Sequence, residues 1–354
     1  MSRYFSKKYD KLIPYTPGEQ PLDQQYIKLN TNESPFPPSP LAVARANREA
    51  ERLQLYSDPL CRDLVSEACA SLGVQPDEIL FTNGSDEILN FAFMAFCDKT
   101  HPAVFPDITY GFYPVFADLN GVPYTEIPLA DDYSVNVNDY VGIGKTIFLA
   151  NPNAPTGLAL PASDIEKIVA SNPDSVVVID EAYVDFGGES ALPLTKKYDN
   201  LLVVQTFSKS RSMAGARLGF GVGNRELIKD LNTIKYSVNP YNVNRMTMAA
   251  GIGALEDGAY FRKNCEAIRR NRAFTTEGLQ KLGFEVLPSK ANFVFAKHTR
   301  ITGKALYLTL KQRGILVRYF DKPRLRDFIR VTIGSEEQMN TFLLVTKQIM
   351  EETV

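Results

Sequence analysis

Short apolar runs separated by longer helical stretches fill the first two thirds of the chain. These runs are rich in β-branched residues and too short to be helices. Such continuous apolar runs are typical of strands in a parallel sheet that has helices on both faces, because these strands are buried on both sides. The pattern therefore predicts an α/β fold, a mainly parallel sheet covered by helices on both faces, with strands at 79–81, 103–105, 146–150, 176–179 and 201–204.

Helical periodicity occupies the segments between these strands and dominates after residue 225. One long helix at 260–282 is expected to bridge two domains. Beyond it, strands and helices alternate as in a smaller α+β domain. We expect an N-terminal arm at 1–40 joining the small domain, a large domain at 41–258 and a small domain at 259–354. The other predicted helices are 41–55, 61–72, 87–96, 225–234, 245–255, 303–313 and 336–352, and the later strands are 285–287, 293–296, 315–318 and 329–333.

The first 40 residues are rich in proline and polar side chains. Residues 30–40 contain four prolines and cannot form a regular helix. The segment fits either a plain linker or an ordered arm that crosses another surface.

Composition excludes several classes of protein. A length of 354 residues fits about two domains, and 44% hydrophobic residues allow a large core. A net charge of −2 gives no general affinity for nucleic acid or anionic membranes. The longest apolar run, 91–97, is too short to cross a bilayer, and the polar N-terminus lacks a secretory signal, so we expect a cytoplasmic protein.

Cysteine and histidine are sparse. The four cysteines are scattered without a CxxC pair, as expected of buried apolar residues in a reducing compartment. The two histidines, His101 and His298, lie near neither a cysteine nor each other. We therefore expect no metal site, and a histidine-based catalytic triad has few candidates.

A lysine with unusual neighbours in the sequence follows the apolar run 201–204. Lys209 lies among the hydroxyls of Thr206 and Ser208, and Arg217 follows eight residues later. Hydroxyls and a guanidinium suit a phosphate, and a lysine beside that anion could form a Schiff base with an aldehyde on the same ligand. Pyridoxal phosphate has both groups. A polar loop with a surface lysine fits this stretch equally well.

An acidic residue ends the preceding apolar run. Asp180 would lie low in the cleft, where a desolvated carboxylate needs a cation such as a protonated pyridine nitrogen. Tyr183 could then reach a phenolate oxygen on the same ring. Lys209 lies 29 residues after Asp180, about one strand–helix–strand unit, so neighbouring strands could hold both groups around one flat ligand. Alternatively, Asp180 caps the next helix.

Two further strand ends add polar turns. Gly84, Ser85 and Asp86 open a helix whose N–H groups could bind an anion, although an ordinary N-cap fits as well. Residues 151–157 form a tight turn with two prolines and two asparagines, which could be turn chemistry alone. The run 219–223 lacks the GxGxxG spacing of a dinucleotide site.

Taken in order, these segments resemble the fold-type-I, pyridoxal-phosphate-dependent aminotransferases, most closely the histidinol-phosphate aminotransferase family. The resemblance runs from about residue 13 to residue 334. Its most specific pieces are Asp180-Glu181-Ala182-Tyr183, Ser208-Lys209 with Gly215 and Arg217, and Leu29-Asn30-Thr31-Asn32-Glu33-Ser34-Pro35.

The resemblance implies roles for individual residues. Lys209 would bond the cofactor, Asp180 would pair with its pyridine nitrogen, Tyr183 would bond its ring hydroxyl and Tyr110 would stack on the ring. The phosphate end would be formed by Gly84, Ser85, Asp86, Thr206, Ser208 and Arg217.

The resemblance also implies a homodimer, in which Tyr56 reaches the phosphate of the partner's cofactor. One departure concerns the turn before Pro155. The family usually has asparagine directly before Pro-Thr-Gly, but this chain has Ala154 there, and Asn153 is the expected substitute.

The implied reaction is transfer of an amino group from L-histidinol phosphate to 2-oxoglutarate in histidine biosynthesis. Tyr15, Arg318 and Arg330 would hold the substrate phosphate or carboxylate. The arginines could instead be exposed on a strand edge. Three alternatives stay open: an aromatic amino-acid aminotransferase, a phosphothreonine decarboxylase, and a binding or regulatory protein that has lost turnover.

Overall fold

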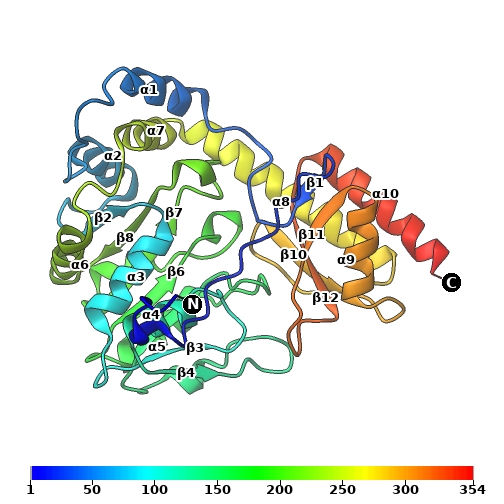
Figure 1. Cartoon of the computed structure of the whole chain (residues 1–354), viewed down its shortest axis with the longest axis horizontal. Coiled ribbons are helices and arrows are strands. Elements are labelled where there is room, and N and C mark those ends of the chain that lie inside the picture. Colours follow the sequence, from blue (N-terminus) through cyan, green and yellow to red (C-terminus); the bar gives the residue numbers. More distant parts are fainter. Residues whose placement is uncertain (1, 354) are drawn as a thin grey trace.

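A seven-stranded sheet forms the centre of the larger part of the molecule (Figure 1). The computed structural model describes residues 2–353. Strands β3 to β7 pair in parallel, whereas β8 runs antiparallel to both its neighbours. In spatial order the strands are β2 (Ile79–Thr82), β8 (Gly219–Gly223), β7 (Leu201–Thr206), β6 (Val177–Asp180), β5 (Thr146–Ala150), β3 (Ala103–Pro106) and β4 (Tyr124–Ile127).

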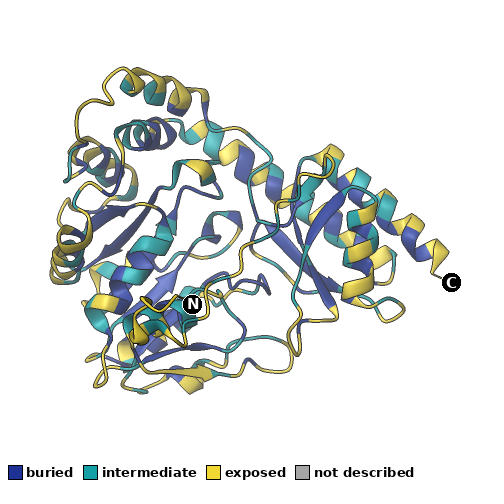
Figure 2. Ribbon diagram, in the orientation of Figure 1, coloured by how far each residue is buried: buried dark blue, intermediate teal, exposed yellow. Residues whose placement is uncertain are grey.

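Helices cover both faces of this sheet, so its strands are buried (Figure 2). In β6, Val178 packs with α3 (Ser85–Phe96), α4 (Tyr113–Asn120) and α6 (Arg225–Val238). Its neighbours Val177 and Ile179 pack on the opposite face with α5 (Ala162–Ser171). A third cluster joins the β2–β8 edge to α1 (Pro40–Ala50), α2 (Arg62–Leu72) and α7 (Arg245–Glu256).

A second sheet of five strands lies in the smaller part of the molecule. The long helix α8 (Gly258–Lys281) runs from the larger part to this sheet (Figure 1). Helix α10 (Glu336–Glu352) packs on α8 and on α9 (Gly303–Gln312). The strand order is β1 (Ile27–Leu29), β11 (Ile315–Tyr319), β12 (Phe328–Thr332), β10 (Phe293–Lys297) and β9 (Glu285–Val286). Short 3₁₀ turns lie at Lys7–Tyr9, Val137–Tyr140, Val184–Phe186, Leu192–Lys196 and Ala214–Ala216.

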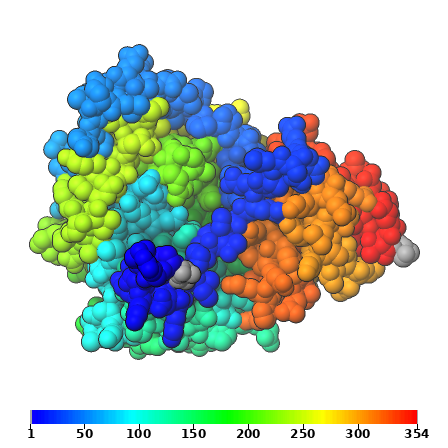
Figure 3. Space-filling model, in the orientation of Figure 1, coloured from blue at the N-terminus to red at the C-terminus, as the bar shows by residue number. Residues whose placement is uncertain are grey.

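The N-terminal segment is an ordered arm. It crosses the front of the molecule from the larger part to the smaller one (Figure 3). There β1 pairs in parallel with β11, although about 290 residues separate the two strands in the chain. The linker interpretation of this segment is therefore wrong, and the arm completes the second sheet.

The predicted fold class is confirmed, and most differences concern element ends. Helix α1 begins at Pro40, after the Ser39 cap, and ends at Ala50 instead of 55, because residues 51–55 are exposed and pack against little. Strands β4 and β8 are not among the predicted strands, whereas α4 and α5 lie in segments that the pattern assigns to helix without bounds. The segment between β6 and β7, which was also expected to be helical, contains only 3₁₀ turns. No helix within residues 2–353 has the length and apolar character needed to span a bilayer.

Candidate active site

A cavity opens beyond the carboxyl ends of β5, β6 and β7, the place where parallel α/β sheets bind ligands. It holds about 510 Å³ of empty space, including the part open to solvent. Asp180 and Lys209 line this one cavity, as predicted from their positions on neighbouring strands. The full lining is Ser85, Asp86, Tyr110, Ala150, Ala154, Asp180, Ala182, Tyr183, Thr206, Ser208, Lys209 and Arg217.

Asp180 is the last residue of β6 and its side chain is buried. Tyr113 donates its phenol proton to Asp180 Oδ2 at 3.1 Å, and the Ala182 N–H donates to Oδ1 at 3.2 Å. Burial nevertheless raises the pKa of the carboxyl to about 6. A cation placed in the cavity would therefore stabilise the ionised carboxylate.

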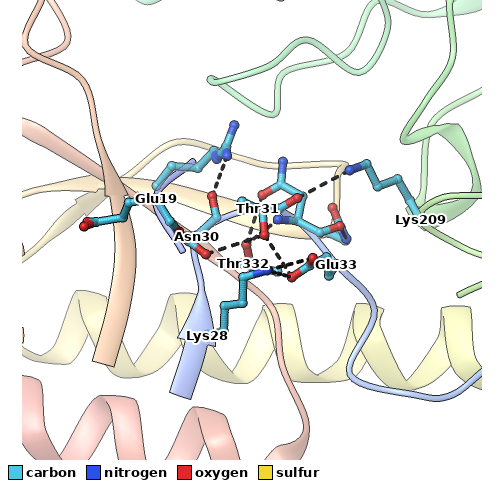
Figure 4. Close-up of polar contacts among 10 residues, drawn as sticks. Glu19, Lys28, Asn30, Thr31, Glu33, Lys209 and Thr332 are labelled. Carbon is cyan, nitrogen blue, oxygen red and sulfur yellow. Dashed lines mark hydrogen bonds and ion pairs between the residues drawn. The ribbon is translucent and has the colours of Figure 1, made fainter. Parts of the chain in front are cut away.

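Lys209 enters the cavity from the loop after β7. Burial lowers the pKa of its amine to about 8, and the positive charge of Arg330 adds to the effect. Nζ lies 3.4 Å from the Thr31 carbonyl oxygen of the arm, as Figure 4 shows. A larger fraction of this amine is neutral, and hence nucleophilic, near pH 8 than of an ordinary lysine.

The start of α3 forms a cradle suited to an anion. The N–H groups of its first turn have no partner within the helix. The helix begins at Ser85, after Gly84 with φ +83°, and a Cβ at Gly84 would lie 2.4 Å from Arg217 Nη2. A Cβ at Gly219 would lie 2.4 Å from the Ser85 nitrogen, so only glycine lets β8 approach this helix start.

Hydroxyls and a guanidinium complete this end of the cavity. The Thr206 and Ser208 side chains hydrogen-bond at 3.0 Å, and both are buried. Asp86 accepts from Tyr110 Oη at 2.6 Å and pairs with Arg217 Nη2 at 3.0 Å. The structure thus gathers the groups that sequence analysis assigned to a phosphate.

Tyr183 lies on the side of the cavity nearest the arm. Its phenol oxygen accepts a hydrogen bond from Asn32 Nδ2 at 2.9 Å. The ring packs edge-on against Phe293 of the second sheet, with centroids 5.1 Å apart. Burial raises the pKa of the Tyr183 phenol, so it stays protonated at neutral pH.

Three predicted cofactor residues lie outside the lining: Gly84, which directly precedes the start of α3, Asn153 and Tyr56. Asn153 donates to the Ile108 carbonyl at 3.0 Å and to Thr156 Oγ1 at 3.1 Å, and it accepts from Thr109 Oγ1 at 2.8 Å. Its side chain therefore holds the turn together, and the methyl group of Ala154 faces the cavity instead. Tyr56 is 81% exposed and stacks on Tyr241, with centroids 4.6 Å apart.

The three predicted substrate residues lie next to the cavity rather than in its lining. The Tyr15 ring stacks on Phe112 at 4.1 Å between centroids. Arg318 donates to the carbonyls of Thr16 and Pro17, both at 3.1 Å. Arg330 donates to the Asn30 carbonyl at 2.9 Å, and its buried Nε has no hydrogen-bond partner within the described chain. Burial lowers the pKa of Arg330.

Sequence reasoning missed several residues that support the site. Tyr113 holds Asp180, Gly219 admits the helix start, and Asn32 contacts Tyr183. Asn32 leaves a weak signal in the sequence. Its backbone is left-handed, with φ +58°, and asparagine tolerates this conformation best among residues with a side chain. The other two carry no local signal, because their roles depend on contacts between distant segments.

The lining fits pyridoxal phosphate. A buried carboxylate whose pKa is raised, an amine whose pKa is lowered and an anion cradle share one cavity, and these groups match the ring nitrogen, the aldehyde and the phosphate. Among residues 2–353, no cluster of three or more His, Cys, Asp or Glu side chains is arranged to hold a metal ion.

Comparison with known proteins supports the same conclusion. Residues 24–344 match the model of the family "Aminotransferase class I and II". A histidinol-phosphate aminotransferase of Brachyspira hyodysenteriae is 49% identical over 99% of this chain and 100% of its own length. The corresponding enzyme of Clostridium acetobutylicum is 45% identical over 97% of this chain and 98% of its own.

Solved structures share the fold. A putative histidinol-phosphate aminotransferase from Erwinia carotovora superposes with a TM-score of 0.85 at 27% identity, covering 93% of this chain and 97% of the other. The Sinorhizobium meliloti histidinol-phosphate aminotransferase, solved in complex with pyridoxal-5'-phosphate, gives a TM-score of 0.86 at 24% identity, covering 94% and 93%. The family match, these relatives and the cavity together show that the chain belongs to the class I and II aminotransferases, enzymes that depend on pyridoxal phosphate.

Proposed function

We propose that the protein transfers the amino group of L-histidinol phosphate to 2-oxoglutarate, a step of histidine biosynthesis. Relatives named histidinol-phosphate aminotransferase align over nearly the whole chain at 45–49% identity. The observation that carries the proposal is the cavity itself, which Asp180 and Lys209 line together beside an anion cradle.

The protein's own groups bind, orient and move protons. When bound, pyridoxal phosphate supplies the aldehyde that takes up the amine and the ring that accepts the electron pair from the substrate Cα–H bond. Asp180 keeps a proton on the ring nitrogen, because a buried carboxylate and N–H⁺ stabilise each other. The Lys209 amine, which lines the cavity, would serve as the base that takes the proton from the substrate Cα and as the acid that returns it. Tyr110 would pack against the ring, and Tyr183 would donate to its hydroxyl oxygen, since both line the cavity.

The phosphate end of the cofactor is held by short-range donors. The α3 start at Gly84, Ser85 and Asp86 supplies backbone N–H groups, and the Asp86 carboxylate orients Arg217. Thr206 and Ser208 supply hydroxyls. We leave Asn153 out of the binding set, because the turn already uses both ends of its amide.

The phosphate of the substrate needs a second cationic site. Arg330 suits this role, since its buried Nε has no hydrogen-bond partner within the described chain and its charge acts on Lys209. Arg318 and Tyr15 lie beside it, and the charges of both arginines act on the Tyr15 phenol. Together they would distinguish a substrate carrying a second anion from a neutral aromatic amine.

The functional test is a half-reaction titration. The purified protein should show the visible band of the lysine-bound cofactor, and L-histidinol phosphate should bleach it at lower concentration than phenylalanine does. Arg330→Met should raise the concentration of histidinol phosphate needed far more than that of phenylalanine. Release of carbon dioxide from phosphothreonine, or equal bleaching by phenylalanine, would favour the alternatives instead. A band that no amine bleaches would indicate a binding protein.

We further propose that the enzyme is a homodimer in which Tyr56 completes the partner's site. Its 81% exposure fits a contact made across an interface. Tyr56→Ala and Lys209→Ala should each be nearly inactive. Mixed after unfolding and refolding, they should recover about a quarter of wild-type activity, since half the dimers carry one intact site. Failure to complement would place Tyr56 outside the partner's site.

The domain division predicted from the sequence is also retained as a proposal. The arm at 1–40 would belong with the small domain at 259–354, because β1 pairs with β11, and 41–258 would form the large domain.

A further inference from the structure

Asn32 is held from several directions in the arm. It is 1% exposed, and its backbone has φ +58°. Its N–H donates to Thr332 Oγ1 at 3.0 Å, and its carbonyl accepts from Asn292 Nδ2 at 3.0 Å. Thr332, labelled in Figure 4, is the last residue of β12, and Arg330 lies on the same strand.

These contacts fix which way the Asn32 amide faces. Thr332 Oγ1 already accepts from the Asn32 backbone N–H, so its own proton goes to Asn32 Oδ1 at 3.0 Å. The oxygen of the amide is therefore on the Thr332 side. Its Nδ2 is left to donate to Tyr183 Oη at 2.9 Å.

This donation determines where the Tyr183 proton can go. A phenol has one proton to donate, and the amide occupies an acceptor position of its oxygen without using that proton. Tyr183 lines the cavity, so the proton is directed toward the ligand space. Ala154 and Ala182, which line the same side, have no polar side chain that could replace it.

We propose that Asn32 is a positioning residue that makes Tyr183 a one-way donor to the ring oxygen of bound pyridoxal phosphate. The inference rests on the cofactor position given under the proposed function. In this scheme, hydrogen bonds from Thr332 of the second sheet to Asn32, and from Asn32 to Tyr183, influence the charge on the cofactor's ring oxygen. Asn32 itself touches neither substrate nor cofactor in this scheme.

The test measures the pH at which the visible band of the bound cofactor titrates, without turnover. A donor to the ring oxygen withdraws negative charge from it, so the neighbouring lysine-derived nitrogen releases its proton at lower pH. Loss of the donor raises the midpoint. Tyr183→Phe should raise it by about one to two pH units, the scale of a hydrogen bond to a charged group.

Asn32→Asp is the decisive variant. A carboxylate has the same shape but can only accept, so it should turn the Tyr183 proton away from the cavity and raise the midpoint about as far as Tyr183→Phe does. A new charge could also act directly. The double variant separates these effects, because Asn32→Asp should add less than about 0.3 pH unit once the phenol is gone.

Two further variants keep the test decisive. Asn32→Gly tolerates the left-handed backbone and removes the amide without adding charge, so it should raise the midpoint part of the way, even if Asn32→Asp does not fold. Lys28→Ala loosens the arm at its ion pair with Glu33, whose charge also acts on Lys209, and should move the midpoint less than either Asn32 variant does. Arg330, Asp180, Asp86 and Lys209, the charged groups that act on Tyr183, stay intact in every variant.

The outcomes separate the inference from the proposed function. An unmoved midpoint in Asn32→Asp and Asn32→Gly, a shift that persists in full beside Tyr183→Phe, or an equal shift in Lys28→Ala would overturn the role of Asn32. A wild-type protein that takes up pyridoxal phosphate without a visible band would instead refute the cofactor position.

Discussion

Replacing Glu181 with glutamine should remove a loss of stability that the wild-type protein suffers as the pH rises. Glu181 is 2% exposed, next to Asp180 and beneath the site. It accepts hydrogen bonds from Ser190 Oγ at 2.6 Å, the Ala191 N–H at 2.6 Å and Gln205 Nε2 at 2.8 Å. Burial outweighs these three donors and raises the pKa of the carboxyl from 4.5 to about 7.

The size of the effect follows from that shift. Below pH 4.5 the carboxyl is protonated in both folded and unfolded chains and costs nothing. Between pH 4.5 and about 7 the unfolded chain releases its proton first, so the free energy of unfolding falls by about 1.4 kcal/mol per pH unit. From pH 5 to pH 8 the accumulated loss from this one group is about 2.5 kcal/mol. Above the folded-state pKa the loss levels off.

Urea unfolding of the cofactor-free protein at pH 5 and pH 8, at one protein concentration, measures this difference. Glutamine keeps the shape and can satisfy the same neighbours if its amide and that of Gln205 rotate. The pH-dependent loss in Glu181→Gln should be smaller than in wild type by about 2.5 kcal/mol. Glu226→Gln, which removes a carboxylate that is 72% exposed, serves as the control. Equal losses in wild type and Glu181→Gln would refute the reasoning.

Three further outcomes can be measured directly. The rate at which cofactor-free protein forms the visible band with pyridoxal phosphate should rise with pH to a midpoint near 8, because the pKa of Lys209 is lowered to about 8, and Arg330→Met should move that midpoint upward. Gly219→Ala should weaken cofactor binding at least about tenfold and cost about 1–3 kcal/mol of stability, whereas Gly215→Ala, which meets nothing within 4 Å, should do neither. Ser335→Ala removes the capping box of α10 and should lower the free energy of unfolding by about 1 kcal/mol with the cofactor affinity unchanged.

Much of the large sheet could be predicted because its strands are continuous apolar runs. β5 lies where the pattern placed it, and β6 and β7 differ from prediction by one or two residues at their ends. β8 escaped notice because its sequence, Gly219–Gly223, alternates glycine with apolar residues. A Cβ added to its glycines would contact Ser85, Ile88 and Leu201, and the local sequence pattern does not reveal these close approaches.

The chemistry of the cavity was predictable for a related reason. Asp180 ends one buried strand and Lys209 follows the next, and the parallel pairing of β6 and β7 places both positions at one edge of the sheet. The expected helix between these strands is absent, and the connection contains only the 3₁₀ turns Val184–Phe186 and Leu192–Lys196. The spacing of Asp180 and Lys209 along the chain therefore allowed their common position at the sheet edge to be predicted. Asn153 shows the limit of this reasoning, because the direction of a side chain in a tight turn depends on the partners it finds, here Ile108, Thr109 and Thr156.

The sequence by itself determined the class of fold, the positions of the central strands and the two groups, Asp180 and Lys209, that line one cavity, because hydrophobic periodicity and the order of segments along the chain can be read locally. Only the tertiary structure decided the course of the arm and the contact of Asn32 with Tyr183. It also decided that Tyr113 supports Asp180. Such contacts join segments tens to hundreds of residues apart, and their energy is gained only when the whole chain has packed.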